Sequence, residues 1–377
     1  MADRPFLFLA ANAPWVYALA HSLSAAAEVT TVQFYDAVNH RRLRPGWPEE
    51  ASGVERRRVV RPPGYAGRLE PLFRSLMRRT VEVQRRALAT RSGQAPRVVV
   101  PYPYLAPWVR QVPDEDLIYY NLDDYELYEP SRALRIRALE DELVDRAALT
   151  ACLSVHQADR LAQRHPRRRR RIRHLPLGVL DAYLNPHPNL APLASTVGYV
   201  GNLGDRIDWR LVGEVADRCR DVTFHVVGFL GAEAERCQAP WREERAAALA
   251  RVNVIHEGGV PQHAVREHYW RYAVNWMPYA ANHPFNLAAC PTKIMDAIAS
   301  GRPFVSTPVP EARLYPSYVT VAQGADGLAA AIARALCEPV DAAERIAYAR
   351  SQTWARRAGQ LRAMLSAAPD TAAAVPG

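Results

Sequence analysis

Short apolar runs alternate with segments of helical period along the whole chain. Runs rich in β-branched and aromatic residues predict strands at residues 6–10, 29–35, 98–102, 117–122, 149–155 and 172–175, and again at 196–200, 222–227, 253–256, 273–277 and 304–307. Strands that alternate with helices are typical of βαβ units and parallel sheets. We therefore predict an α/β protein with two Rossmann-like domains. Because ligands of such sheets bind beyond the carboxyl ends of the strands, we expect the two domains to face a ligand cleft.

A proline-rich stretch without clear periodicity, from Asn185 to Pro192, separates the two series of strands. Such a stretch is typical of a domain boundary. The predicted organisation is an N-terminal domain over 1–180, a linker over 181–194, a C-terminal domain over 195–340, a final helix over 341–366 and a disordered tail over 367–377.

The five cysteines are widely spaced and contain no C-x-x-C pair. That pattern is typical of reduced thiols in a cytoplasm and predicts no metal site. No uninterrupted apolar run reaches the roughly eighteen residues of a membrane-spanning helix. We therefore expect a cytoplasmic protein whose contact with a membrane would be peripheral, on its inner face.

Positive charge is concentrated in the first half of the chain. Of the 48 basic residues, 47 are arginine and one is lysine. Residues 1–180 contain 29 basic and 20 acidic residues, whereas the rest of the chain contains equal numbers of basic and acidic residues. An excess of this kind indicates an anionic partner, such as a phospholipid surface, a lipid pyrophosphate or a nucleic acid.

Two arginine-rich segments are candidates for binding this anionic partner. A predicted helix over 67–91 has arginines beside an apolar stripe of Leu69, Leu72, Phe73, Leu76, Thr80, Val83 and Ala87. It suits an anionic membrane surface, and an ordinary helix packed on a core explains the same pattern. The run Arg167 to Arg171 has no interleaved aromatic residue and belongs to no recognisable nucleic-acid module. We expect a solvated loop or an anionic surface contact there, and no nucleic-acid partner.

The single lysine, Lys293, lies in the first turn of a predicted helix that begins near Pro291 and stops at Gly301. A cation at the positive end of a helix is unfavourable unless an anion lies between it and the free N–H groups, which is how helix starts bind phosphate. Asp296 follows one turn later on the same face, where its carboxylate could accept hydrogen bonds from a ribose or sugar hydroxyl. A solvated lysine without a function is the alternative.

Glycines follow several strands of the second half. Gly201 and Asn202 come after the strand at 196–200, Gly228 follows the strand at 222–227, and Gly259 and Val260 follow the strand at 253–256. Glycine lets backbone N–H groups approach a pyrophosphate closely, and a tight turn from strand to helix explains the same residues. Three such ends near Lys293 predict a nucleotide site.

These residues resemble a known superfamily. The segment PTKIMDAIASGRPFVSTP, which starts at Pro291, is similar to the P-x-K-x-x-E-x-x-A-x-G-x-P-V-V donor segment of GT-B glycosyltransferases. With the strand at Tyr199, the strand at Val226 and the segment from Leu175, the resemblance covers roughly residues 117–337. It implies the GT-B fold, a nucleotide diphosphate sugar on the C-terminal domain, an acceptor on the N-terminal domain and no metal or cofactor. Thr292 and Lys293 would then bind the diphosphate, Asp296 the ribose, and the loop at 257–261 the base.

The chain departs from this family at two positions. Asp296 stands where the family usually has glutamate, and Ala288 stands where many retaining members have a second glutamate that binds the sugar. Other groups must therefore contact the sugar, and Asn282, His283 and Asn286 are the polar candidates. Whether the anomeric configuration is retained or inverted stays open.

Two adjacent carboxylates, Asp123 and Asp124, follow the predicted strand at 117–122. A carboxylate at a strand end can take the proton of an acceptor hydroxyl. The segment resembles the strand-end aspartate of group 1 type bacterial exopolysaccharide transferases, including xanthan-type glucuronosyltransferases, where this residue is the proposed base. The match falls best on Asp123, with Asp124 as a helper or a helix cap. Both residues could instead serve only as caps.

The sequence therefore predicts a metal-independent glycosyltransferase that transfers a sugar from a nucleotide diphosphate sugar to a hydroxyl of a saccharide or a lipid-linked acceptor. Uridine is the default nucleoside of the family. A sugar-nucleotide epimerase and a non-catalytic scaffold of a polysaccharide-assembly complex are the alternatives.

Overall fold

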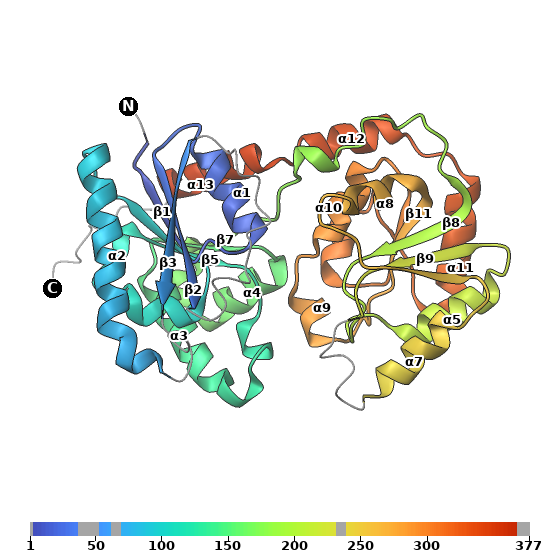
Figure 1. The fold of residues 1–377 in the computed structure, drawn as a ribbon, viewed down its shortest axis with the longest axis horizontal. Coiled ribbons are helices and arrows are strands. Elements are labelled where there is room, and N and C mark those ends of the chain that lie inside the picture. The colour runs from blue at the N-terminus through green and yellow to red at the C-terminus, as the bar shows by residue number, and fades with distance from the viewer. Residues whose placement is uncertain (1–2, 37–52, 62–68, 231–238, 368–377) are drawn as a thin grey trace. The chain divides into compact units, whose positions relative to one another are not determined.

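The computed structural model describes residues 3–36, 53–61, 69–230 and 239–367. The chain forms two compact units (Figure 1), of which the first holds residues 1–178 and 354–377 and the second holds residues 179–353. Each unit is built around one parallel sheet. The predicted α/β fold with two Rossmann-like domains is thereby confirmed.

Within the described residues, the first unit has a seven-stranded parallel sheet with the order β3-β2-β1-β4-β5-β6-β7. Its strands are β1 (Phe6–Leu9), β2 (Val29–Asp36), β3 (Val54–Arg61), β4 (Arg97–Val100), β5 (Leu117–Asn121), β6 (Leu149–Cys152) and β7 (Ile172–His174). Its helices are α1 (Pro14–Leu23), α2 (Glu70–Ser92), α3 (Ala133–Arg146), α4 (Val155–Arg164) and α13 (Trp354–Ala367), with the short 3-10 helices η1 (Pro103–Trp108), η2 (Asp114–Asp116), η3 (Tyr125–Leu127), η4 (Pro130–Arg132) and η5 (Pro166–Arg171).

The core of the first unit lies where helices cover the sheet. Leu7 and Leu9, which share one face of β1, belong to the same buried cluster as Met77 of α2 and Leu143 of α3. The alternating residues Phe6 and Phe8 are buried as well but belong to the other face of the strand. A strand buried on both faces is expected in a parallel sheet with helices on both sides.

The second unit repeats this architecture. Its described residues form a six-stranded parallel sheet with the order β10-β9-β8-β11-β12-β13. The strands are β8 (Leu193–Val200), β9 (Thr223–Val227), β10 (Val254–Gly258), β11 (Tyr272–Met277), β12 (Phe304–Ser306) and β13 (Thr320–Val321). The helices are α5 (Trp209–Arg218), α7 (Pro240–Leu249), α8 (Val265–Arg271), α9 (Pro284–Ala288), α10 (Thr292–Ala299), α11 (Gly324–Cys337) and α12 (Ala342–Arg350), with η6 (Asp181–Tyr183) and η7 (Pro310–Leu314).

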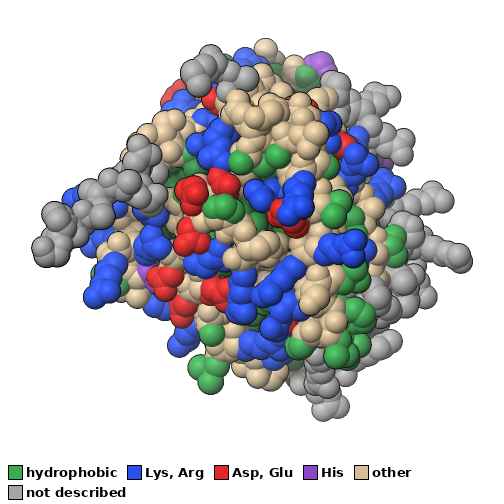
Figure 2. All heavy atoms as spheres, turned by 90° about the vertical axis from the view of Figure 1, so that its left-hand side faces the viewer, with side chains coloured by type: hydrophobic (Ala, Val, Ile, Leu, Met, Phe, Trp, Pro, Cys, Tyr) green, Lys and Arg blue, Asp and Glu red, His purple; other side chains and the backbone are tan. Residues whose placement is uncertain are grey.

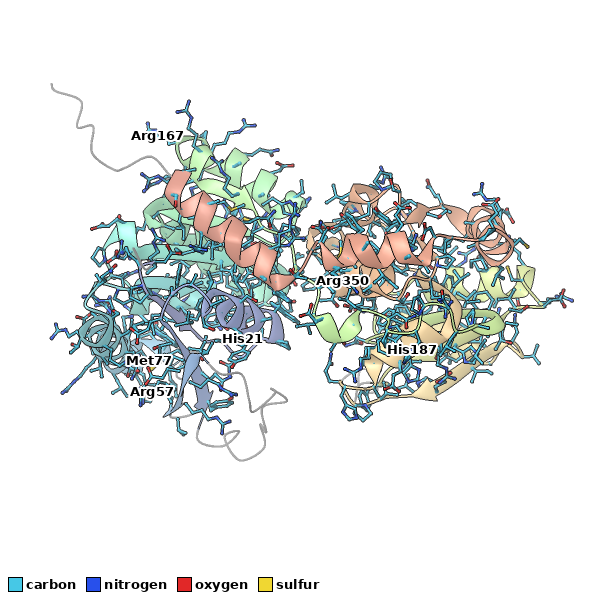
Figure 3. The ribbon with its side chains drawn as sticks, turned by 90° about the horizontal axis from the view of Figure 1, so that it is seen from above. His21, Arg57, Met77, Arg167, His187 and Arg350 are labelled. Carbon is cyan, nitrogen blue, oxygen red and sulfur yellow. The ribbon has the colours of Figure 1, made fainter. Side chains whose placement is uncertain are left out.

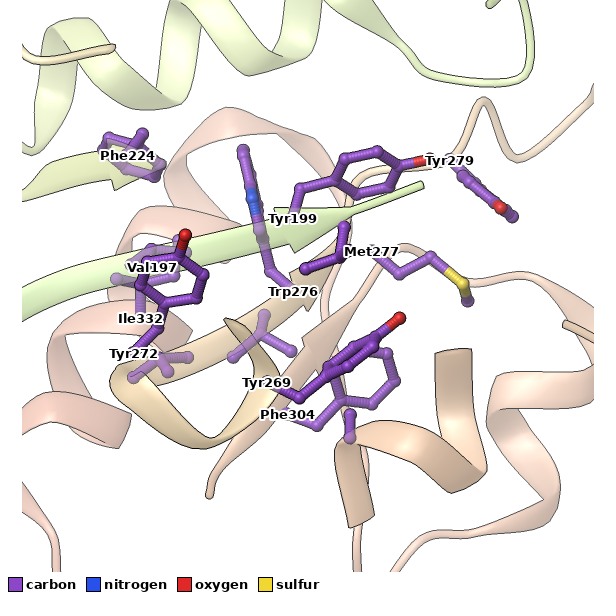
Figure 4. Close-up of a cluster of buried hydrophobic side chains, with 14 of the residues drawn as sticks. Val197, Tyr199, Phe224, Tyr269, Tyr272, Trp276, Met277, Tyr279, Phe304 and Ile332 are labelled. Atoms are coloured by element: carbon purple, nitrogen blue, oxygen red, sulfur yellow. The ribbon is translucent and has the colours of Figure 1, made fainter. Parts of the chain in front are cut away.

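Large side chains fill the core of the second unit (Figure 4). Phe224 and Trp276 lie with ring centroids 5.2 Å apart, and Phe304 and Ile332 belong to the same buried cluster. The strand order reverses between β8 and β11. Ligands of doubly wound sheets bind at such a switch point, beyond the carboxyl ends of the strands.

Two strands are not predicted from the sequence, β3 and β13. β3 reads VERRRVVR and is an edge strand of the first sheet, with Arg57, Arg58 and Val60 exposed. Charged residues are common on edge strands because one side of the strand faces water, and they obscure the apolar pattern. β13 has only two residues, which is too short for any periodicity.

The predicted linker over 181–194 is wrong, because these residues belong to the second unit. η6 lies within them, the side chain of Asn185 donates a hydrogen bond of 3.0 Å to the carbonyl of Ser300, and β8 begins at Leu193. The boundary falls instead between Gly178 and Val179.

The predicted single helix over 341–366 is also wrong. It is two helices, α12 in the second unit and α13 in the first, separated by a bridge between Thr353 and Val179. The carbonyl of Gln352 accepts a hydrogen bond of 2.9 Å from the N–H of Val179, a contact that a continuous helix would not allow. The expected disordered tail over 367–377 lies outside the described residues apart from Ala367, which ends α13.

The predicted helix over 67–91 is α2, which begins at Glu70. Its core side carries Met77, Val81 and Leu88, while Leu72 is 76% exposed and Val83 is 53% exposed. Much of the predicted apolar stripe thus faces away from the core. Figure 2 looks onto this side of the first unit, where arginine and hydrophobic side chains are interspersed. No helix among the described residues is long and apolar enough to cross a membrane.

The run of five arginines forms η5, just before β7. Arg167 and its neighbours Arg169 and Arg170 are exposed, and Arg167 projects outward from the first unit (Figure 3). A solvated loop or a contact with an anionic surface stays the prediction for this segment.

Candidate functional site

A cavity of about 340 Å³ opens at the switch point of the second unit. The ends of β8 and β9, the start of α10, the loop between β10 and α8, and η6 contribute to its wall. The lining residues are Tyr183, Val200, Gly201, Asn202, Val227, Gly228, Phe229, Val260, Gln262, Val265, Tyr269, Thr292, Lys293 and Asp296. All of the residues predicted to bind the nucleotide therefore line one cavity, except Gly259.

Glycine is required where β8 and β9 end. Gly201 has a φ of +150°, and a Cβ atom added to it would lie 2.3 Å from Nζ of Lys293. A Cβ atom on Gly228 would lie 1.9 Å from the carbonyl oxygen of Gly201. The two turns thus approach each other and the lysine more closely than any side chain would allow.

The backbone N–H groups of these glycines already have acceptors. The N–H of Gly201 donates to the carbonyl of Val227, and that of Gly228 donates to the carbonyl of Gly258, both at 2.9 Å. The expectation that these two amides bind a pyrophosphate is therefore wrong. Because Gly201 and Gly228 have no side chain, they leave space beside Lys293.

The side chain of Lys293 is half-buried in the cavity wall. Its Nζ lies 5.4 Å from the ring centroid of Tyr199 and 5.8 Å from that of Tyr279. The guanidinium of Arg206 lies 5.1 Å from the ring of Tyr279. Burial acts to raise the pKa of the Tyr279 hydroxyl, but the charges of Lys293 and Arg206 outweigh it and lower that pKa.

No carboxylate of the described chain lies within ion-pairing distance of Lys293. Lys293 itself belongs to the first turn of α10, whose N-cap is Pro291. Proline has no side-chain acceptor for the first amides of the helix. A helix start and a cation that both lack an anion, in the wall of one cavity, have the chemistry that phosphate binding requires.

Asp296 lines the same cavity one turn further along α10. Burial raises its pKa to about 7, and Lys293 and the Thr292 side chain offset only part of this effect. The pKa of Tyr183 is raised to about 12, by burial first and by the charge of Asp296 second. Near neutral pH the Asp296 carboxyl can therefore accept hydrogen bonds from a ligand or donate one.

The predicted base-binding loop divides into two parts. Glu257 belongs to β10, where it is held by His225 at 2.5 Å and by the hydroxyl of Tyr272 at 2.9 Å, so it is part of the sheet and not of the loop. Val260 lines the cavity, and Gly259 lies against the ring of Phe229, where a Cβ atom would approach the ring to 2.2 Å. Phe229 is 69% exposed and lines the cavity, where its ring could stack on a flat ligand.

The three residues expected to contact the sugar do not line this cavity. Asn286 is fully buried: its Oδ1 accepts from Nε of Arg206, and its Nδ2 donates to the carbonyls of Arg206 and Ala280. The expectation of a sugar contact is therefore wrong for Asn286, which instead fixes Arg206 beside Tyr279. His283 stacks on Phe285 with ring centroids 5.9 Å apart, and Asn282 is exposed.

Asp123 and Asp124 lie in the first unit, shortly after β5. Oδ2 of Asp123 accepts a hydrogen bond of 2.7 Å from the hydroxyl of Tyr128, and its Oδ1 accepts one of 2.9 Å from the N–H of Asp124. Asp124 caps η3, since its carboxylate accepts from the N–H of Glu126 at 3.2 Å. Burial raises the pKa of Asp124. The capping interpretation thus applies to Asp124, while Asp123 is the more accessible carboxylate.

A buried network fixes the backbone at Asp123. Glu140 is 1% exposed and accepts hydrogen bonds from the hydroxyl of Tyr119 at 2.9 Å and from Nδ2 of Asn121 at 3.1 Å. The same amide of Asn121 donates to the carbonyl of Asp123 at 3.2 Å. Arg160 connects Glu140 to Glu126 on η3, each at 3.0 Å. The end of β5 is therefore held in one conformation.

Comparison with known proteins identifies the second unit. Residues 194–338 match the family of group 1 glycosyl transferases. The second unit is a group 1 glycosyltransferase domain. No curated protein is similar enough in sequence to count as a match.

The whole chain is similar in fold to several solved structures. Sucrose-phosphate synthase from Thermosynechococcus elongatus has a TM-score of 0.68 and 16% identity, over 97% of this chain and 100% of that one. HepE of Anabaena, solved in complex with UDP, has a TM-score of 0.69 and 15% identity over the same shares. A glycosyltransferase from Rickettsia africae has a TM-score of 0.68 and 10% identity, over 99% of this chain and 100% of that one. The chain has the GT-B fold.

Proposed function

We propose that this protein is a glycosyltransferase that transfers a sugar from a nucleotide diphosphate sugar, with UDP as the default nucleotide, to a hydroxyl of a saccharide or a lipid-linked acceptor. The observation that carries the donor assignment is Lys293, a half-buried cation without a carboxylate partner in the described chain, at the start of α10 and in the wall of a cavity. HepE of Anabaena was solved with UDP and with UDP-glucose, which supports UDP as the first nucleotide to test.

In this proposal the diphosphate binds between Nζ of Lys293 and the first N–H groups of α10. Asp296 accepts hydrogen bonds from the ribose hydroxyls, and the base lies against Phe229 and Val260. Negative charge grows on the diphosphate as its bond to the sugar breaks, and a fixed cation and helix start stabilise that charge most in the transition state. Because these groups supply the positive charge, the reaction needs no metal ion.

Asp123 is the proposed base. The acceptor oxygen forms a bond to the anomeric carbon while the bond from that carbon to the diphosphate oxygen breaks. The diphosphate leaves with the electron pair, and the carboxylate of Asp123 takes the proton of the acceptor hydroxyl. Asp124 stabilises η3 and so positions Asp123.

The acceptor could be held at a membrane through the first unit. The α2 face, defined as Val60 of β3 and Leu72, Leu76 and Val83 of α2 with the arginines Arg58 and Arg79, exposes apolar and basic groups together. Arg58 and Arg79 have no carboxylate within ion-pairing distance among the described residues. Arginines and exposed leucines on one face suit an anionic bilayer. The protein would then act at the inner face of the cell membrane.

Replacement of Lys293 by Ala tests the donor assignment. Loss of charge-assisted hydrogen bonds to the diphosphate should weaken UDP binding by about 1.5 to 3 kcal/mol, which is roughly ten- to hundredfold. Titration calorimetry with UDP measures this directly. Arg210→Ala is the matched control, because Arg210 lies on α5 outside the cavity with its side chain 76% exposed. Equal UDP affinity in wild type and Lys293→Ala would remove the assignment.

Release of UDP from UDP-sugars separates the proposed reaction from its alternatives. A transferase releases UDP when an acceptor is added and continues to do so in excess EDTA. An epimerase interconverts the sugar without release, and a scaffold with no working donor site binds no UDP.

A further inference from the structure

We infer that the first unit binds a small phosphorylated molecule in a second cavity, between the starts of β1 and β4 and the last turns of α13. The inference goes beyond the proposed function and does not depend on it, because this cavity and the donor cavity have no residue in common. The ligand class is a soluble phosphate monoester, such as a phosphorylated sugar, whose phosphate group pairs with Arg97.

The cavity has a volume of about 460 Å³ and lies wholly within the first unit. Its polar lining residues come from three segments that are far apart in the sequence: Asp3 and Arg4 before β1, Gln94 and Arg97 at the start of β4, and Arg362 and Ser366 on α13. Because β1, β4 and β5 are parallel, the cavity lies at the edge of the sheet opposite to the one where Asp123 follows β5. Its ligand is therefore distinct from the acceptor of the proposed reaction.

Three guanidinium groups line this cavity, and two of them have a carboxylate partner. Arg4 forms an ion pair with Asp116, and Arg362 forms one with Asp3. The side chain of Arg97 has neither a hydrogen bond nor a carboxylate within ion-pairing distance in the described part of the chain. The cavity thus has one positive charge that no carboxylate neutralises.

The surroundings of Arg97 disfavour its charge. The side chain is half-buried, and its guanidinium lies over the ring of Phe6, 5.9 Å from the ring centroid. Burial, and then the charge of Arg4, lower the pKa of Arg97, so its charged form is less stable here than in water. A guanidinium contacts an aromatic ring through its face, while its N–H groups point outward in the plane. These N–H groups are therefore available to an anion in the cavity.

Phosphate suits this arrangement better than a carboxylate. A guanidinium binds a phosphate through two parallel N–H···O bonds, and a phosphate monoester has close to two negative charges near neutral pH. Arg362 pairs with Asp3 through Nε, and neither of its Nη groups has a partner among the residues that the structure describes. A dianion could therefore be contacted by Arg97 of β4 and by Arg362 of α13 together.

The size of the cavity indicates a ligand larger than free phosphate. A volume of about 460 Å³ is within the range of small-molecule sites, about 300 to 1,000 Å³. Oγ of Ser366 donates to the carbonyl of Arg362 at 3.1 Å, so its lone pairs can accept a hydrogen bond from a ligand. The side-chain amide of Gln94 has no partner among the described residues. Neutral polar groups of this kind match the hydroxyl groups of a phosphorylated sugar.

Such a ligand would join α13 to the sheet. α13 follows the second unit in the chain but belongs to the first unit. A phosphate shared by Arg97 and Arg362 stabilises the contact between β4 and this helix. We expect the ligand to raise the melting temperature and to slow amide hydrogen exchange in α13.

Calorimetry with ribose 5-phosphate tests the site. Arg97→Ala should weaken binding about ten- to hundredfold, because it removes charge-assisted hydrogen bonds. Arg97→Lys keeps the charge but not the paired N–H groups, so its affinity should lie between those of Arg97→Ala and wild type. Lys293→Ala, which changes the donor cavity, should bind ribose 5-phosphate as wild type does. Arg169→Ala is the control for an exposed arginine outside both cavities and should also bind as wild type does.

Three further ligands identify the chemistry that is recognised. Ribose should not bind, and inorganic phosphate should bind more weakly than ribose 5-phosphate. Dihexanoyl phosphatidic acid, which presents the same phosphate group on a lipid, should bind no more tightly than inorganic phosphate. Tighter binding of this lipid than of ribose 5-phosphate would overturn the assignment to a soluble ligand.

Other results would overturn the site itself. Binding that is lost in Lys293→Ala and kept in Arg97→Ala would place the phosphate in the donor cavity. Equal losses in Arg97→Ala and Arg169→Ala would show unspecific attraction by net charge, and no binding to wild type would leave no site. Hydrogen exchange in α13 that ribose 5-phosphate does not slow would also contradict the inference. Melting temperatures without ligand show whether each variant is folded, and Arg97→Lys provides the comparison if Arg97→Ala is not.

Discussion

Lys293 and Asp296 occupy one turn of α10, and their surroundings affect them differently. Lys293 lies beside two tyrosine rings, which stabilise a cation through their faces. Asp296 has no arginine partner among the described residues, and burial raises its pKa to about 7. The site therefore keeps a fixed positive charge and a carboxyl whose ionisation changes near neutral pH.

This difference predicts that donor binding depends on pH. If only the ionised Asp296 accepts both ribose hydroxyls, affinity for UDP-glucose should rise about tenfold from about pH 6 to about pH 8, across a pKa of about 7. UDP-glucose is the suitable probe because it has no phosphate that titrates in this range. Calorimetry at several pH values measures the effect, and Asp296→Asn should abolish it. A pH dependence that persists in Asp296→Asn would contradict the assignment.

The same carboxyl should affect stability. Its pKa is raised in the folded state, so the folded protein binds the proton more tightly than the unfolded chain. The contribution of Asp296 is therefore most favourable below the unfolded pKa of about 4 and is lost as pH rises to about 7. The melting temperature of Asp296→Asn should fall less than that of wild type over this window, as differential scanning calorimetry can measure.

At the residue scale, sequence reasoning finds the residues that carry an unusual chemical signal. Lys293 is conspicuous as the one lysine of the chain, and Asp296 follows from its place on the same helix face. Tyr183, Phe229 and Tyr279 are missed, because they come from separate segments and meet only in the folded unit. Asn286 is misjudged, because its type suggests a ligand contact while only the structure reveals its burial.

At the scale of elements, the turns after β8 and β9 set the space around Lys293. Gly228→Ala would place a Cβ atom 1.9 Å from the backbone oxygen of Gly201, so one of the two turns must move. We expect a loss of stability of about 1 to 3 kcal/mol and weaker UDP binding. Chemical denaturation and calorimetry measure the two effects.

Gly359→Ala is the matched control for this prediction. Gly359 lies within α13, and an added Cβ atom there would meet no other atom within 4 Å. Alanine is a better helix former than glycine, so this change should stabilise the protein by about 0.5 to 1 kcal/mol. Equal stability of Gly228→Ala and wild type would show that the turns can adjust.

Element by element, strands with continuous apolar runs can be predicted, and those without them cannot. β5 and β9 are buried and read as apolar runs, whereas β3 carries arginines at the sheet edge. The break between α12 and α13 is missed because the segment keeps a helical composition. What separates the two helices is the pairing of Thr353 with Val179, a contact between residues far apart in the sequence.

At the scale of the whole molecule, the α2 face predicts attachment to anionic membranes. Wild type should float with vesicles that contain phosphatidylglycerol and not with pure phosphatidylcholine vesicles. Arg58→Glu with Arg79→Glu should lower binding at least about tenfold, since each arginine near an anionic surface contributes about 1 kcal/mol. Leu72→Asp should also lower binding, by removing an exposed apolar group.

Matched controls lie elsewhere on the first unit. Leu134 on α3 is 81% exposed, and Arg169 on η5 is exposed, and neither belongs to the α2 face. Leu134→Asp and Arg169→Glu should bind vesicles as wild type does. If Arg169→Glu weakens binding as much as the α2 changes, membrane attachment follows from net charge alone and the α2 face has no special part in it.

The return of α13 to the first unit has a practical consequence for engineering. The first unit is assembled from residues 1–178 and 354–377. Near the two places where the chain passes from one unit to the other, Nε of Arg357 donates a hydrogen bond of 3.2 Å to the carbonyl of Leu177. The second unit is one uninterrupted stretch, 179–353. A gene segment with these bounds could be exchanged between relatives as a single cassette, whereas a polypeptide truncated before α13 would lack part of its first unit.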